Sequence, residues 1–271
     1  IILLVIASVF LIGCRNTNSS SNSQEISGVI AESGSTTVQP LAERLADSFM
    51  EKNPHVNVII QGGGSSVGIK AAYEGIVDIG ASSRELTPDD PPVEKFLLAK
   101  DSIAVIVNPA NPIDNLSIEQ VRNVFSGNIS NWNEVGGADH EIHLVAREEG
   151  SGTRTAFQDM VMTDEDGSED RVSRRAILQS SNGSIIQVVR SDPNAAGFIS
   201  FGYLTEVVKA ISINGSAPAK ENAKNGDYPI VRPLYFVTGN QPVGIFKTFI
   251  DYCFEEEAQE IVADEGYISV K

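Results

Sequence analysis

Arg147–Arg154, which reads REEGSGTR, lies between a strand-like run from Glu141 to Ala146 and a helical pattern that begins near Thr155. A strand that passes through Gly, Ser and Thr directly into a helix leaves backbone N–H groups unpaired at the start of the helix. Hydroxyl groups and a guanidinium accompany those N–H groups in this stretch. The combination is typical of an anion-binding site. We expect the rest of the chain to repeat this unit and to fold two lobes around the ion.

The composition is that of a globular protein with one large or two ordinary domains. The chain has 271 residues, 41% of them hydrophobic, which is enough for sizeable cores. Its 20 Lys+Arg against 36 Asp+Glu give a formal charge of −16, which argues against a nucleic-acid partner. A small anion is still acceptable as a ligand, because charges farther away than roughly 8–10 Å are screened at physiological salt.

The first residues resemble the end of an export signal. Residues 1–12 are almost all apolar and are followed by Gly13 and Cys14. The run is too short for a membrane-spanning helix and is typical of the hydrophobic region of a secretory signal. Leu11–Cys14 is similar to the lipoprotein cleavage box, in which the cysteine becomes the lipidated first residue. We expect residues 1–14 to be a signal and Cys14 to anchor the protein to the outer face of the cell membrane. An ordinary signal with an incidental cysteine is the alternative.

Residues 15–25 are rich in Ser, Asn and Thr, which is typical of a flexible tether. If Cys14 is lipidated, Cys253 has no partner for an intramolecular disulfide. Cys253 lies in an apolar helical pattern with Phe249 and Ile250. We therefore expect this cysteine to be a core residue.

From Ser27 onward, strand-like and helix-like segments alternate. Residues 56–60 are β-branched, whereas the apolar residues of 41–50 recur at helical spacing. Repeated strand–turn–helix units with short loops predict an α/β fold with a largely parallel sheet. The composition changes after the strand at 102–108, where we expect the chain to cross into a second lobe. The predicted boundaries are 26–104 and 205–271 for lobe I and 105–204 for lobe II.

Four turns share the design of the opening stretch. They are Ser33–Thr37, Gly63–Gly68, Gly80–Arg84 and Gly150–Arg154. In an open α/β sheet such turns lie at the carboxyl ends of strands, where ligands bind. Glycine lets the backbone approach the ligand, hydroxyls donate or accept hydrogen bonds, and helix N-termini add partial positive charge. One such turn is usually structural, but four in one chain predict a shared anion site.

Three arginines accompany these turns. Arg147 ends a strand and can give bidentate hydrogen bonds to an oxyanion, with Glu149 orienting it. A simple salt bridge is the alternative for this arginine. Arg154 either points to solvent or pairs with Glu148. Arg84 either contacts the ligand or forms a pair between the lobes.

Two enzyme motifs match in part. Gly63–Lys70 resembles a P-loop, but Lys70 falls one place too late and Ala71 replaces the required hydroxyl. Gly64–Gly68 fits the G-x-S-x-G pattern of a hydrolase, with Ser66 as the nucleophile and His140 or His143 as the base. This hydrolase hypothesis leaves the other three turns unexplained and is the less favoured alternative. No cluster of His, Cys and Asp has metal-ligand spacing, so we expect neither a metal nor another cofactor.

The four turns, in this order, resemble those of the phosphate-binding lipoproteins of ABC-type phosphate importers. The matching motifs are STTVQPL at 35–41, GGSSVG at 63–68, DIGASSR at 78–84 and REEGSGT at 147–153, and the similarity extends to YPIVRPLY at 228–235. The resemblance implies a periplasmic-binding-protein-like fold of type II. Each lobe would be a mainly parallel sheet flanked by helices, and the ligand cleft would lie between the lobes. It also implies a monomeric, non-catalytic protein that delivers inorganic phosphate to the permease subunits of the importer.

The resemblance further implies which residues bind phosphate. By position these are Thr36, Thr37, Ser65 and Ser66 in the first lobe and Arg147, Ser151, Gly152 and Thr153 in the second. Glu149 falls where the family often has the acid that pairs with the arginine, and Arg84 is a supporting residue.

One position departs from the family pattern. Ser83 stands where the best-known members have an aspartate that accepts the proton of phosphate, so Ser83 or Ser82 would have to accept it here. Selectivity over sulfate or arsenate is therefore less secure than phosphate binding itself. Another tetrahedral oxyanion such as sulfate is the alternative ligand.

Overall fold

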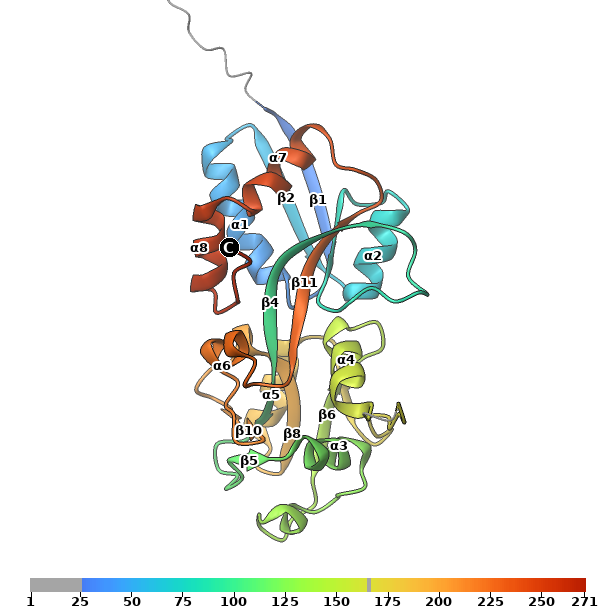
Figure 1. Ribbon diagram of the computed structural model, residues 1–271, viewed down its shortest axis with the longest axis vertical. Helices are drawn as coiled ribbons and strands as arrows, with labels where there is room; N and C mark the ends of the chain where they lie inside the picture. Colours follow the sequence, from blue (N-terminus) through green and yellow to red (C-terminus); the bar gives the residue numbers. More distant parts are fainter. Residues whose placement is uncertain (1–25, 165–166) are drawn as a thin grey trace, which may run out of the picture.

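The computed structural model describes residues 26–164 and 167–271. The predicted signal, the tether and Cys14 lie outside these residues. Figure 1 shows two lobes stacked along the long axis, with two strands running between them. These strands are β4 (Glu94–Val107) and β11 (Val231–Thr238), which pair antiparallel with each other. The predicted two-lobed α/β fold is confirmed.

The first lobe is a sheet between two layers of helices. Its strands are β1 (Gly28–Gly34), β2 (Val56–Gly62) and β3 (Ile79–Ser82), and its helices are α1 (Gln39–Lys52), α2 (Ser65–Tyr73), α7 (Gly244–Cys253) and α8 (Glu256–Asp264). The strand order is β2-β1-β3-β11-β4, with the first three strands parallel. Side chains of α1, α7 and α8 fill one core cluster, which includes the buried free thiol of Cys253 as predicted. Helix α2 covers the other face.

The second lobe repeats this three-layer arrangement. Its strands are β5 (Asn115–Leu116), β6 (His143–Arg147), β7 (Ile177–Gln179), β8 (Ala195–Ser200), β9 (Lys209–Ala210) and β10 (Ser212–Ile213). Its helical elements are α3 (Ile118–Ser126), η1 (Trp132–Val135), α4 (Gly152–Phe157), η2 (Gln158–Met162), α5 (Asn182–Ser191), η3 (Phe201–Tyr203) and α6 (Lys220–Asn225). The sheet continues in the order β4-β8-β6-β7, and β6 is parallel to both of its neighbours. Each lobe therefore has a core of its own.

The boundary predicted at residue 205 needs a correction. Ile211, Ile213, Tyr228 and Ile230 pack in the same cluster as Phe125 of the second lobe. Strand β9 also pairs with the far end of β4, in the second lobe. The chain therefore returns to the first lobe along β11, near residue 231. An apolar run marks a strand but does not say which of two sheets receives it.

The ends of the parallel strands position the ligand-binding turns. Strands β1, β2 and β3 all end toward the second lobe, and β6 ends toward the first (Figure 1). Helix α2 follows β2 after two residues, and α4 follows β6 after four. In the described part of the chain, none of the helices combines the length and the apolar character that a membrane span requires.

Glu32 on β1 is a charged residue type in a buried position. Its side chain is 2% exposed, and its Oε2 has no hydrogen-bond partner among the described residues. Burial, with a smaller contribution from nearby Glu43, raises the pKa of Glu32 well above its ordinary value of 4.5. The folded protein therefore holds this carboxyl in its neutral form more strongly than the unfolded chain does.

Glu32→Gln is expected to stabilise the protein at pH 7. With a raised pKa in the folded state, the contribution of Glu32 to stability is fully present below about pH 4.5 and is lost as pH rises through the folded-state pKa. Glutamine cannot ionise, so the melting temperature at pH 7 should rise by a few degrees, about 2–4 °C per kcal/mol. The gain should disappear near pH 4. Thermal unfolding of the wild type and of Glu51→Gln, an exposed control on α1, provides the comparison. A variant that melts at or below the wild-type temperature at pH 7 would contradict the expectation.

Candidate anion-binding site

The turns of the two lobes touch at their junction. Ser66 N–H donates to the carbonyl of Gly150 at 3.2 Å, which joins the start of α2 to the turn before α4. A Cβ at Gly152 would lie 2.2 Å from Ser65 Oγ and 2.6 Å from Ser83 Oγ, so only glycine fits between these hydroxyls. Figure 1 shows α2 and α4 facing each other across this junction. The structure thus brings the second, third and fourth turns together.

The first turn joins the same cluster through Thr37. Its hydroxyl lies 3.1 Å from the hydroxyl of Thr153 on the other lobe. The carbonyl of the preceding residue, Thr36, accepts a hydrogen bond from Tyr203 at 2.6 Å. Burial raises the pKa of Tyr203 to about 12, so its hydroxyl stays protonated and able to donate. Thr36 Oγ1 is buried and has no hydrogen-bond partner in the described part of the chain, which leaves it available to a ligand.

Arg147 ends β6 and is 1% exposed. Its Nε donates to Glu148 Oε2 at 3.2 Å and to the carbonyl of Gln179 at 3.2 Å. Its Nη2 donates to Glu148 Oε1 at 2.9 Å and to the carbonyl of Ser180 at 2.9 Å. The hydrogen bonds of residues 26–164 and 167–271 leave Nη1 unused, so one corner of the guanidinium can donate to an anion.

The acid beside Arg147 is not the one expected. Glu148 forms the ion pair, whereas Glu149 is exposed. The prediction that Glu149 orients this arginine is therefore corrected. Arg154 does not pair with Glu148 either, because its Nη1 donates to the carbonyl of Arg147 at 2.7 Å. Alternation along a strand would place residues 147 and 149 on the same side, but β6 ends at Arg147 and Glu149 already lies in the turn before α4, so the alternation does not extend to it.

Arg84 supports the second turn. It is buried and forms an ion pair with Asp90 through Nη1 at 2.6 Å and Nη2 at 2.7 Å. The same Nη2 lies 3.3 Å from Ser66 Oγ, so the guanidinium donates to that hydroxyl. Asp90 lies in the same lobe as Arg84, between β3 and β4, so this ion pair does not join the lobes, and the supporting role of Arg84 in the site stays a prediction. The hydrogen bond from Arg84 is the main reason why the pKa of Asp90 lies below its ordinary value.

The remaining serines differ in how free their hydroxyls are. Ser82 Oγ donates to the carbonyl of Arg84 and accepts from its N–H, so its hydroxyl is used within its own turn. Ser65 Oγ accepts from Ser83 N–H at 3.0 Å, and Ser151 Oγ caps α4 by accepting from Arg154 N–H at 3.3 Å. Ser65 and Ser151 therefore keep a proton to donate. Among the described residues, the hydrogen-bond partner of Ser83 Oγ is Ser65 Oγ, at 3.4 Å.

An ion pair between β4 and β11 lies at the same junction, and the sequence did not reveal it. Arg232 and Asp101 are cross-strand neighbours, both about 1% exposed, with Nε to Oδ2 at 3.0 Å and Nη2 to Oδ2 at 2.8 Å. Arg232 Nη1 also reaches Thr153 Oγ1 at 2.8 Å, and Nη2 reaches Thr37 Oγ1 at 3.2 Å. The signal that could have found the pair is Arg232 at the start of one apolar strand and Asp101 directly before the apolar run of the other.

Burial disfavours the charged forms of both Asp101 and Arg232. It raises the pKa of Asp101 and lowers the pKa of Arg232, since each charged form loses its hydration. The attraction between the two groups opposes both shifts. Asn182, at the start of α5, is a second polar residue that the sequence did not reveal. It is 0% exposed and donates from Nδ2 to Thr37 Oγ1 at 3.1 Å.

The hydrolase hypothesis does not match this geometry. His143 begins β6 and Arg147 ends it, so the histidine lies at the opposite end of the strand from the site. His143 is instead paired with Asp192 at 2.7 Å, and His140 lies in the exposed loop that precedes this end of β6. Within the described residues, the contact to Ser66 Oγ comes from Arg84. In the same residues no group of His, Cys, Asp or Glu is placed to hold a metal ion.

The protein has two lobes with separate cores, which two strands join. Hydroxyls and arginines line the junction between the lobes. These features define a solute-binding protein for a small oxyanion. A family model described as a PBP superfamily domain matches residues 19–257. The phosphate-binding protein PstS of Bacillus subtilis is 34% identical over 262 residues, which cover 94% of this chain and 85% of that protein. PstS of Borreliella burgdorferi is 28% identical and covers 100% of this chain and 98% of that protein.

Solved structures agree with these relatives. A substrate-binding protein from Clostridium perfringens, crystallised with bound phosphate, has a TM-score of 0.85 and 37% identity and covers 90% of this chain and 100% of that chain. An ABC-type phosphate transport receptor from Vibrio cholerae has a TM-score of 0.75 and 34% identity and covers 89% of this chain and 100% of that chain. The chain therefore belongs to the PstS family of the PBP superfamily.

Asp101→Asn is expected to destabilise the protein strongly. It leaves the buried Arg232 guanidinium without its counter-charge, and breaking a buried pair in this way costs about 3–5 kcal/mol. Asp114→Asn is the matched control, because Asp114 pairs with Lys209 while its own side chain is 83% exposed. Such a surface pair contributes about 0–1 kcal/mol. Urea unfolding of both variants measures the difference, and equal midpoints would contradict the structural role given to Asp101.

Proposed function

We propose that this chain is an extracytoplasmic solute-binding protein that captures inorganic phosphate between its two lobes and delivers it to the permease of an ABC importer. Its relatives are named as phosphate-binding proteins, and one of the similar structures contains bound phosphate. Arg147 is the observation that carries the proposal. It is a buried guanidinium held by Glu148 and two carbonyls, with Nη1 left to donate.

The rest of the site suits the same ligand. The hydroxyls of Ser65, Ser66, Ser151 and Thr153 and the free Thr36 Oγ1 surround the junction, and they come from both lobes. A tetrahedral oxyanion has four oxygens that accept hydrogen bonds, so it can take donors from both lobes and favour their closure. The protein would act as a carrier and not as an enzyme, with no cofactor.

The location in the cell is part of the proposal. The apolar residues 1–12 and Cys14 support export and attachment of a lipid to that cysteine. The tether at 15–25 would let the two lobes move beside the outer face of the membrane, where the permease opens. We propose that the protein works there as a monomer.

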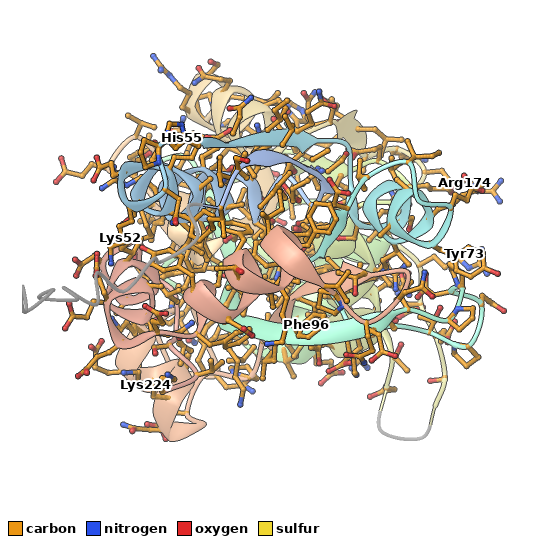
Figure 2. The ribbon with its side chains drawn as sticks, turned by 90° about the horizontal axis from the view of Figure 1, so that it is seen from above. Lys52, His55, Tyr73, Phe96, Arg174 and Lys224 are labelled. Carbon is orange, nitrogen blue, oxygen red and sulfur yellow. The ribbon has the colours of Figure 1, made fainter. Side chains whose placement is uncertain are left out.

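Arg147→Ala is expected to weaken phosphate binding by roughly 100-fold or more, because a buried anion loses charge-assisted hydrogen bonds of about 1.5–3 kcal/mol each. Titration calorimetry measures the dissociation constant, and thermal unfolding checks that the variant is folded. Arg174→Ala is the control, since Arg174 is exposed and lies at the edge of the molecule in Figure 2. Near-native phosphate binding by Arg147→Ala would remove this arginine from the site.

Sulfate is the alternative ligand, and Ser83 is the observation that favours it. A carboxylate at this position would repel an oxyanion that carries no proton, whereas a hydroxyl can either accept the proton of hydrogen phosphate or donate to sulfate. We therefore expect sulfate to compete measurably with phosphate.

Ser83→Asp should restore discrimination against sulfate. The added carboxylate has no hydrogen bond to accept from sulfate, so the sulfate affinity should fall roughly tenfold or more relative to the phosphate affinity. Competition calorimetry between pH 5 and 8 gives both constants, with Ser191→Asp on the exposed end of α5 as the control for added charge. An unchanged ratio of the two affinities would mean that residue 83 does not contact the ligand.

A further inference from the structure

Asn182 has a fixed orientation in the site. The backbone N–H of Ser200 can only donate, and it donates to Asn182 Oδ1 at 3.1 Å. The other end of the amide, Nδ2, therefore faces Thr37 Oγ1 at 3.1 Å and donates to it. The hydrogen bond from Ser200 thus fixes the orientation of the Asn182 amide, and this orientation makes the hydroxyl of Thr37 an acceptor.

Arg232 acts on the same hydroxyl and on its neighbour. A guanidinium has no acceptor, so Thr37 Oγ1 must accept from Nη2 and Thr153 Oγ1 must accept from Nη1. Asp101 holds the edge of the guanidinium that Nε and Nη2 form. Arg232 cannot turn away without breaking that buried pair.

These contacts settle which threonine donates in the 3.1 Å contact between the two hydroxyls. Thr37 Oγ1 already accepts from Asn182 and Arg232, which occupies both of its lone pairs, so Thr37 donates its proton to Thr153. Thr153 Oγ1 then accepts from Thr37 and Arg232. The hydrogen bonds of the described residues give Thr153 no acceptor for its own proton.

We propose that Asn182 and Arg232 are positioning residues of the anion site, which fix Thr37 and Thr153 as a chain of donors that ends on the bound ligand. The proposal rests on the function proposed above and deepens it, because Thr153 can only donate to the ligand oxygen that it meets, and an anionic oxygen is a stronger acceptor than a protonated one. On a phosphate that carries a proton, the protonated oxygen is better placed at another part of the site, because Thr153 Oγ1 has no lone pair left to accept that proton. Neither positioning residue needs to touch the ligand.

A second arginine in the site follows the same arrangement. Arg84 is held by Asp90 and donates to Ser66 Oγ at 3.3 Å, which leaves the Ser66 proton free to donate. In both cases an acid fixes a buried arginine, and the arginine fixes a hydroxyl as a donor. A hydroxyl that must reorient before it donates is a poorer donor than one that is already oriented.

A double-mutant cycle on phosphate affinity tests the proposal. Calorimetry is carried out on the wild type, Thr153→Val, Asn182→Ala and the double variant, with Thr248→Val on the exposed face of α7 as the control. Thr153→Val should weaken binding roughly 10- to 100-fold, the value of a hydrogen bond to a charged group. Asn182→Ala should weaken binding several-fold in the wild-type background but have little effect when residue 153 is valine. Residues that act through one another show this coupling.

Equal fold-changes for Asn182→Ala in the two backgrounds would overturn the proposal, because a purely structural role does not depend on the Thr153 hydroxyl. If Asn182→Ala does not fold, Arg232→Lys serves in the same cycle, since an ammonium keeps the charge but cannot reproduce the planar fork. A wild type that fails to bind phosphate would overturn the proposed function as well. A wild type that binds, weakened by Arg147→Ala but not by Thr153→Val, would overturn the donor chain alone.

Discussion

The burial of Arg232 beside Asp101 is the constraint on which the junction of the two lobes depends. Each side chain is about 1% exposed, and an isolated charge in such a place would be strongly unfavourable. The antiparallel pairing of β4 with β11 makes the two residues direct neighbours, so the connecting strands cannot slip in register without separating the charges. The same strands link the lobes, so one interaction fixes both the connection and the back of the ligand site.

Because each lobe has its own core, the connection through β4 and β11 matters for how the two lobes are held together. The helices of each lobe pack on their own part of the sheet, and the clusters around Phe49 and Phe125 have no residue in common. Outside the strands, the lobes meet through polar contacts such as those of Thr37 with Thr153 and of Ser66 with Gly150. Two stable bodies with a polar junction are suited to opening and closing around a polar ligand. A bound ligand would then accept hydrogen bonds from donors of both lobes that have no acceptor among the described residues.

The sequence predicted what depends on local pattern. Strand, glycine and hydroxyl, and helix follow one another within a few residues, so the four turns and the position of Arg147 could be found from spacing alone. It could not predict what depends on register. Arg232 and Asp101 are 131 residues apart and meet only through the pairing of β4 with β11. The same limitation explains the error for residues 205–230, whose apolar pattern fits either lobe. The choice between Glu148 and Glu149 depends on which way one side chain points.

The charges of the site explain how an acidic protein can hold an anion. Arg147, Arg84 and Arg232 each have a carboxylate partner, so these pairs bring little net positive charge to the junction. The ligand would be held by directed donors, namely one guanidinium corner and several hydroxyls whose oxygens are already occupied. Such donors act over hydrogen-bond distance, whereas the remaining surface charge is screened. On the proposed function, a formal charge of −16 would therefore not oppose binding, and selectivity would come from where protons lie in the site rather than from its total charge.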